Sequence, residues 1–221
     1  MSLYLVGENI DKARSHYLAE SGKLLHLMRG IYVDAQDDID AIVLKHGVRI
    51  ARYLYPKAYL SGATAYRLGP SKDGRLYLSA RRKQRTRIRS LEIVQNESPL
   101  QPSTITAIID DGLGEMRVDV SSVRQRFLES FRRTEHAVSI DDTMRQAASD
   151  RLVEEYGSGK GAADAIWVLA RENGWYREAE LAERFLTRSH STETTIPTVA
   201  STPIRLAGSV EKAAATTASS V

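Results

Sequence analysis

The sequence predicts an α+β protein, and three patterns along the chain support this fold class. Near the N-terminus, an expected helix precedes two short apolar runs separated by Arg29-Gly30, and an apolar periodic segment follows them. The middle of the chain, residues 75–120, alternates apolar and polar residues as strands do. From Ser121 to about Thr187, apolar residues recur at helical spacing. We therefore expect a helix–hairpin–helix module, a small antiparallel or mixed sheet and a C-terminal helical portion.

The first expected elements are a short strand and an amphipathic helix. Residues 3–6 predict the strand. Asn9 is expected to cap a helix that continues to about Glu20, where Ser21-Gly22 ends it. The helix is expected to carry one apolar stripe, made of Ile10, Ala13, Tyr17 and Leu18.

Residues 24–28 and 31–33 are predicted to form a tight β-hairpin. The two residues between them, Arg29-Gly30, suit a hairpin turn because glycine adopts positive φ without steric cost. One buried helix is then expected from Ile39 to Leu54. Residues 59–65 predict a strand that leads into a second, closely packed helix.

The middle of the chain predicts two hairpins. Residues 75–80 and 86–95 are expected to pair as antiparallel strands, with the basic residues 81–85 at the hairpin tip. Residues 104–109 and 115–120 predict the second hairpin, because Asp-Asp-Gly-Leu-Gly separates them. These strands would form the small sheet.

The C-terminal part predicts four helices. The first two are expected from Ser121 to about Phe131 and from a cap at 139–142 to Tyr156. The other two, 161–173 and 175–187, are expected to pack as an antiparallel pair joined by Asn173-Gly174. These segments suggest a winged-helix-like module over 1–70, an α+β domain over 71–187 and a disordered tail or linker over 188–221, where Ser, Thr, Ala and Pro dominate.

Composition limits the class of protein more than the function. The 221 residues include no cysteine, which excludes a disulfide scaffold, a thiol nucleophile and a cysteine-bound zinc site. No apolar run approaches the roughly 20 residues that span a bilayer, and no leader is evident, so we expect a cytoplasmic protein. The net charge is only +3, yet six cations lie within residues 81–89 without an acid among them. The positive charge is therefore local.

The N-terminal third resembles a known family. A helix, then SGKLLHLMRGIYV, then YLYPKAYLSGATAYRLG, is similar to the AbiEi family of antitoxins and regulators over about residues 10–68. In that family a winged-helix segment leads into an arginine-glycine hairpin and then a helix that begins with a similar YLSG motif. Related modules also occur ahead of HipA-like kinases. The family's further helices before the hairpin have no counterpart here, so major-groove reading by a helix is not expected.

The resemblance and the basic run together predict a DNA-binding transcriptional regulator or antitoxin component. Its partners would be DNA, as the operator of the toxin gene, and the cognate toxin. Guanidinium and ammonium groups contact phosphate independently of sequence, whereas a wing can reach a groove. The expected contact residues are the following nine: Lys23, His26, Arg29, Arg81, Arg82, Lys83, Arg85, Arg87 and Arg89.

Other readings of the sequence remain open. The chain could be a non-catalytic interaction module of a HipA-like kinase toxin, and the basic run could contact an acidic protein or only solvent. No nucleophile motif or paired carboxylate emerges, so we expect no enzyme and no cofactor; an enzyme whose catalytic residues the sequence does not identify is the third and weakest alternative. The histidines have no metal-ligand spacing, and Asp110-Asp111 suits a turn. Residues 157–161, although glycine-rich with a lysine, lack the preceding strand and the Ser or Thr of a phosphate-binding loop.

Overall fold

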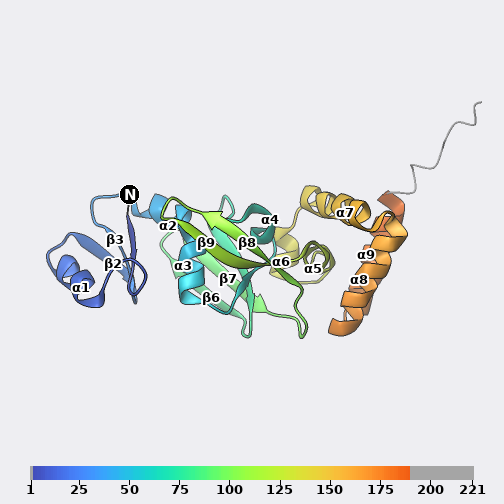
Figure 1. The fold of residues 1–221 in the computed structure, drawn as a ribbon, viewed down its shortest axis with the longest axis horizontal. Helices are drawn as coiled ribbons and strands as arrows, with labels where there is room; N and C mark the ends of the chain where they lie inside the picture. Colours follow the sequence, from blue (N-terminus) through green and yellow to red (C-terminus); the bar gives the residue numbers. More distant parts are fainter. Residues whose placement is uncertain (1, 190–221) are drawn as a thin grey trace, which may run out of the picture. The chain divides into compact units, whose positions relative to one another are not determined.

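The computed structural model describes residues 2–189. This part of the chain is an α+β fold with a three-stranded antiparallel sheet, a six-stranded mixed sheet and nine helices (Figure 1). The tail predicted for 188–221 lies outside the described residues except for 188 and 189, which continue the last helix. No helix among residues 2–189 is long and apolar enough to cross a membrane.

The N-terminal sheet contains the predicted hairpin. Its strands are β1 (Leu3–Leu5), β2 (Leu24–Met28) and β3 (Ile31–Asp34), in the order β1-β3-β2. Gly30 has φ +78°, and a Cβ at this position would collide with the hydroxyl of Tyr53. The turn therefore requires glycine both for its backbone conformation and for the close approach of Tyr53.

The first helix differs from the prediction in its cap and its buried face. Helix α1 (Lys12–Glu20) begins after Asp11, whose side chain accepts a hydrogen bond from the backbone N–H of Arg14. Asn9 instead accepts from the N–H of Leu5 at 2.7 Å, which fixes the chain before the helix. The predicted apolar stripe is wrong, because Tyr17 is 67% exposed and Ser15 is the buried residue of the helix.

The single helix predicted from Ile39 to Leu54 is two helices. Helix α2 (Ile39–Lys45) and helix α3 (Gly47–Leu54) meet at His46, whose φ of −98° and ψ of 17° are not helical. The ring of His46 is buried and lies 2.8 Å from a carboxylate oxygen of Asp111. A Cβ on Gly47 would lie 2.8 Å from Pro70. Tertiary contacts thus break the helix at a point where its apolar pattern continues.

The six-stranded sheet has the order β6-β7-β5-β4-β9-β8. Its strands are β4 (Tyr59–Leu60), β5 (Arg75–Ala80), β6 (Gln84–Ile88), β7 (Leu91–Glu97), β8 (Thr104–Asp110) and β9 (Glu115–Ser121). The β8–β9 hairpin is as predicted. Because β4 belongs to this sheet, strands from both sides of the predicted domain boundary at residue 70 share one apolar core.

The prediction for residues 81–95 is wrong. Strand β5 pairs in parallel with β7, and β6 pairs with the far side of β7. The segment predicted as one strand turns at Arg89-Ser90, where Arg89 has φ +55°. Residues 81–83 consequently form a crossover between non-adjacent strands and not a hairpin tip, and Arg85 and Arg87 lie on an edge strand.

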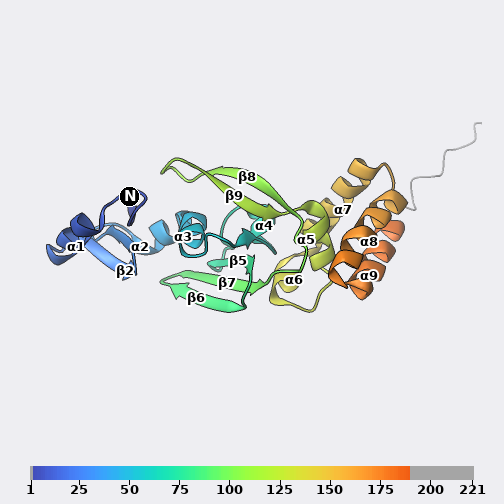
Figure 2. The same cartoon turned by 60° about the horizontal axis from the view of Figure 1, so that its bottom comes forward.

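The C-terminal helices build a second core. They are α5 (Val123–Glu129), α6 (Glu135–Ser139), α7 (Asp142–Tyr156), α8 (Gly159–Asn173) and α9 (Tyr176–Ser189). Helices α5, α7, α8 and α9 lie together in Figure 2. Their shared core includes Phe127, Leu152, Ile166 and Leu186. Helix α6 was not predicted. Helix α4 (Thr64–Arg67) follows β4, as the sequence indicated.

Candidate nucleic-acid interface

All nine basic residues predicted as contacts are solvent-exposed, but they do not form one cluster. The crossover and the edge strand distribute the basic run over three separate hollows. Lys83 and Arg85 line a large cleft, Arg87 and Arg89 line a hollow beside the hairpin, and Arg81 and Arg82 line an apolar groove. Among the hairpin residues, His26 borders the second of these hollows.

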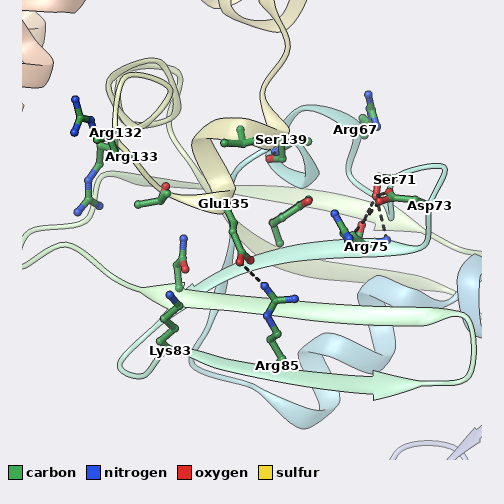
Figure 3. A pocket seen from close by; sticks show the side chains of 15 residues that line it. Arg67, Ser71, Asp73, Arg75, Lys83, Arg85, Arg132, Arg133, Glu135 and Ser139 are labelled. Atoms are coloured by element: carbon green, nitrogen blue, oxygen red, sulfur yellow. Dashed lines mark hydrogen bonds and ion pairs between the residues drawn. The ribbon is translucent and has the colours of Figure 1, made fainter.

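The large cleft has a volume of about 940 Å³ and is rich in cations. Figure 3 shows that these side chains come from three regions: the α4–β5 segment, the start of β6 and the segment before α6. Two carboxylates, Asp73 and Glu135, also line the cleft. The six cations that line it are Arg67, Arg75, Lys83, Arg85, Arg132 and Arg133.

Several of these cations are already paired. Arg85 contacts Glu92 at 3.2 Å and forms a short ion pair with Glu135. Arg75 contacts the same Glu92 at 3.1 Å, and Arg132 stacks over the ring of Trp175 at 4.2 Å. A ligand would have to compete with these contacts.

Lys83 and Arg133 form no ion pair with any residue among 2–189, and both are exposed. Their charges can therefore meet an anionic ligand without the loss of an internal ion pair. These two residues are the best test of binding at the cleft.

Buried hydrogen bonds hold helix α6 at the edge of the cleft. Ser61 and Nδ1 of His136 lie 2.9 Å apart, and the Ser139 hydroxyl accepts a hydrogen bond from the N–H of Ala63 at 3.0 Å. Burial lowers the pKa of His136 to about 4, so its ring is neutral near pH 7. Ser61 is completely buried, which makes this serine–histidine pair a structural link and not a nucleophile that a substrate can reach.

The second hollow brings the predicted wing and the basic run together. It has a volume of about 280 Å³ and is lined by His26 of β2 and by Arg87 and Arg89 at the end of β6. The ring of His26 packs on Tyr32 with a centroid distance of 4.8 Å. Lys23 and Arg29 lie at the two ends of β2, both exposed. This basic hollow joins residues that are about 60 positions apart in the sequence.

Arg81 and Arg82 border a mainly apolar groove of about 320 Å³. Its floor includes Leu54, Pro56 and Ala80. The backbone carbonyl of Arg82 accepts a hydrogen bond from the Gln95 side chain at 2.7 Å, which fixes the crossover. An apolar groove with a basic rim suits an acidic, partly apolar protein segment better than a phosphate backbone.

Sequence reasoning missed four cleft residues: Arg67, Arg75, Arg132 and Arg133. The adjacent Arg132-Arg133 is visible in the sequence as a basic pair between two helices. Arg67 and Arg75 flank the turn cluster at 69–74, and nothing in their spacing indicates that they face α6. Their position depends on the order of the strands.

Two other sequence features have structural explanations. Asp111 receives hydrogen bonds from Arg49 at 2.8 and 2.9 Å and contacts His46; although burial opposes it, these bonds lower the pKa of Asp111 well below its usual range. Residues 157–161 connect two helices, with Gly157 ending α7 and Ser158 capping α8. Within residues 2–189, no three His, Asp or Glu side chains are arranged to hold a metal ion.

No protein-family model matches this chain, and no curated protein matches it in sequence. The resemblance to AbiEi antitoxins therefore stays a prediction, based on the two sequence blocks quoted above.

Proposed function

We propose that this chain is a cytoplasmic DNA-binding regulator or antitoxin component of a toxin–antitoxin system, without catalytic activity. In this proposal residues 1–70 act as a winged-helix-like module, and the β2–β3 hairpin is its wing. Its partners are the cognate toxin and DNA that carries the operator of the toxin gene.

One observation supports the proposal above the others. His26 of the hairpin shares a hollow with Arg87 and Arg89, so a phosphate backbone that contacts the edge strand would also pass the proposed wing. Non-specific affinity for DNA depends mainly on such cation–phosphate contacts. The larger cleft offers a second basic surface to the same kind of ligand.

A salt titration of duplex binding tests the proposal and separates the two surfaces. The first variant is Arg87→Ala with Arg89→Asn, because asparagine tolerates the positive φ of Arg89. The second is Lys83→Ala with Arg133→Ala. Removing a cation that contacts phosphate should reduce the magnitude of the negative slope of log K against log salt by about one unit. We expect the first variant to reduce this magnitude by about two units and to bind every DNA sequence more weakly.

A matched control removes two exposed arginines from the C-terminal helices, Arg171→Ala with Arg177→Ala, and should leave the slope unchanged. The wing is tested by His26→Ala with Arg29→Ala. If these residues enter a groove, the free-energy preference for the DNA upstream of the protein's own gene over random DNA should fall by about 1–3 kcal/mol. Equal slopes for wild type and both basic variants would remove the DNA proposal.

The apolar groove favours a second candidate, a non-catalytic interaction module of a HipA-like kinase toxin. Its basic rim, formed by Lys57, Arg81 and Arg82, would receive an acidic segment of the partner. This function predicts that Arg81→Glu with Arg82→Glu abolishes binding to the cognate toxin. It also predicts that the Arg87 and Arg89 substitutions leave the salt slope of DNA binding unchanged.

A further inference from the structure

Strand β8 ends the six-stranded sheet, and its outer edge, which no strand among residues 2–189 pairs with, is unusually apolar. Its seven residues, TITAIID, contain no proline and only one charge, Asp110 at the end of the strand. Ile105 is 51% exposed and Ile108 is 62% exposed. Edge strands of natural proteins are usually protected by charges, proline or a covering element, because an open edge pairs with another strand.

The ladder to β9 determines which backbone groups of β8 are free. The N–H of Ser122 donates to the carbonyl of Ser103 at 2.8 Å. Because backbone bonding alternates along an antiparallel pair, Ile105, Ala107 and Ile109 bond to β9. Thr104, Thr106 and Ile108 therefore direct their N–H and C=O groups toward the open edge.

We propose that a second copy of this chain pairs with β8 in antiparallel fashion, with Ala107 opposite Ala107 of the other copy. This register pairs all seven residues of the strand, and it is two-fold symmetric, as most homodimer interfaces are. Ile105 then faces Ile109, and Thr106 faces Ile108. Asp110 faces Thr104, so no two like charges are directly opposed across the new pair of strands.

The neighbouring strand β9 makes both faces of this joined sheet self-complementary. On the inner face, β9 places Val120 beside Ile105, Val118 beside Ala107 and Met116 beside Ile109. Every cross-strand row on that face is therefore apolar across four strands, and the exposed Ile105 becomes covered by an isoleucine.

The outer face has its own cross-strand rows, and two of these end in opposite charges. Thr106 pairs with Asp119 on β9 and Ile108 pairs with Arg117. In the joined sheet a row would run from Asp119 through Thr106 and Ile108 to Arg117 of the second copy. Each such row ends in charges of opposite sign, and symmetry produces it twice.

The other edge of the sheet does not permit the same association. Strand β6 carries Arg85 and Arg87 on one face. Antiparallel self-pairing centred on Arg85, Thr86 or Arg87 would place arginine opposite arginine, which is unfavourable. The choice of edge therefore follows from the charges on the two strands.

Sedimentation equilibrium of the full chain tests the proposal. The wild-type mass should rise with concentration from 24.6 kDa toward twice this value. Two variants change the paired positions: Thr106→Lys with Ile108→Lys, and Thr106→Glu with Ile108→Glu. Each alone should raise the dimer dissociation constant at least about tenfold, because like charges meet twice. An equimolar mixture should restore the dimer, because the lysines of one variant face the glutamates of the other.

A control variant, Leu100→Lys with Val168→Lys, adds charge at exposed apolar residues outside β8 and should dimerise as wild type does. Circular dichroism shows whether each variant is folded. A second measurement needs no variant: amide exchange at Thr106 and Ile108 should slow as wild-type concentration rises. A wild type that stays monomeric, variants that dimerise normally, or a mixture that stays monomeric would each overturn the proposal.

Discussion

Glu129 of helix α5 ends a buried chain of polar side chains that begins at Tyr59 of strand β4. The Gln125 amide donates to the Tyr59 hydroxyl and to Glu129 Oε1, both at 2.8 Å, while the other oxygen of Glu129 has no hydrogen-bond partner among the described residues. Burial raises the pKa of Glu129 from 4.5 to about 7, and hydrogen bonding to Gln125 reduces the shift only in part. Glu129 is therefore protonated in the folded protein over a range where the unfolded chain is ionised.

This raised pKa predicts how stability depends on pH. The folded protein holds a proton on Glu129 that the unfolded chain has released, so the contribution of Glu129 to stability is complete below about pH 4.5 and is lost as the pH rises through 7. We expect Glu129→Gln to gain stability relative to wild type from pH 5 to pH 8, by on the order of 1–3 kcal/mol. Urea denaturation of both proteins across this range measures the difference.

The buried His136 provides a check on that prediction. Because the pKa of His136 is lowered, the free energy of unfolding rises from about pH 4 to 6.5, whereas the contribution of Glu129 falls as the pH rises. The contribution of His136 is the same in wild type and in Glu129→Gln. The difference between the two proteins therefore isolates Glu129. A constant difference from pH 5 to 8 would mean that the carboxyl group titrates normally.

At the scale of elements, the β2–β3 turn shows how local conformation and tertiary contact combine. Gly30 and Gly22 have similar positive φ values of +78° and +71°, but no atom would lie within 4 Å of a Cβ on Gly22. We expect Gly22→Ala to cost about 1 kcal/mol for its backbone conformation alone. Gly30→Ala should cost clearly more, because it also displaces Tyr53 from its 3.0 Å hydrogen bond to the carbonyl of Val6.

Chemical denaturation of the two glycine variants measures this difference directly. Tyr53→Phe combined with Gly30→Ala serves as the control, because it removes the colliding hydroxyl. Equal destabilisation by Gly22→Ala and Gly30→Ala would show that the contact with Tyr53 does not limit the turn.

At the scale of the molecule, the sheet-containing region and the C-terminal helices are connected by one buried and one exposed set of contacts. Arg126 of α5 donates to the carbonyl of Ala65 at 2.5 Å and stacks over the ring of Tyr66 at 4.7 Å. Asn173 of α8 exchanges hydrogen bonds with the backbone of Gln101 at 2.9 and 3.1 Å. These links join the two regions that contain the apolar cores.

We therefore expect the two cores to unfold together. Both tryptophans, Trp167 and Trp175, belong to the C-terminal helical region, so their fluorescence reports that core, whereas far-ultraviolet circular dichroism reports the whole backbone. The two signals should give the same midpoint in urea. An earlier fluorescence midpoint would show that the helical region unfolds independently of the sheet.

The sequence by itself determined the elements whose signals are local. The Arg29-Gly30 hairpin, the β8–β9 hairpin and the α8–α9 pair joined at Gly174 follow from turn residues and periodicity, which act over a few positions. The fold class followed from the same signals. The nine basic residues predicted as DNA contacts are all exposed, as charged groups usually are, but their role as contacts stays a prediction.

Only the tertiary structure decided where those basic residues lie. The parallel pairing of β5 with β7 distributes residues 81–89 over three hollows, and the same strand order brings Arg67, Arg75 and Arg133 to the large cleft. The break at His46 likewise depends on Asp111, 65 residues away. Strand order and long-range contacts depend on how all the apolar faces are buried together, and for this reason a local pattern does not contain them.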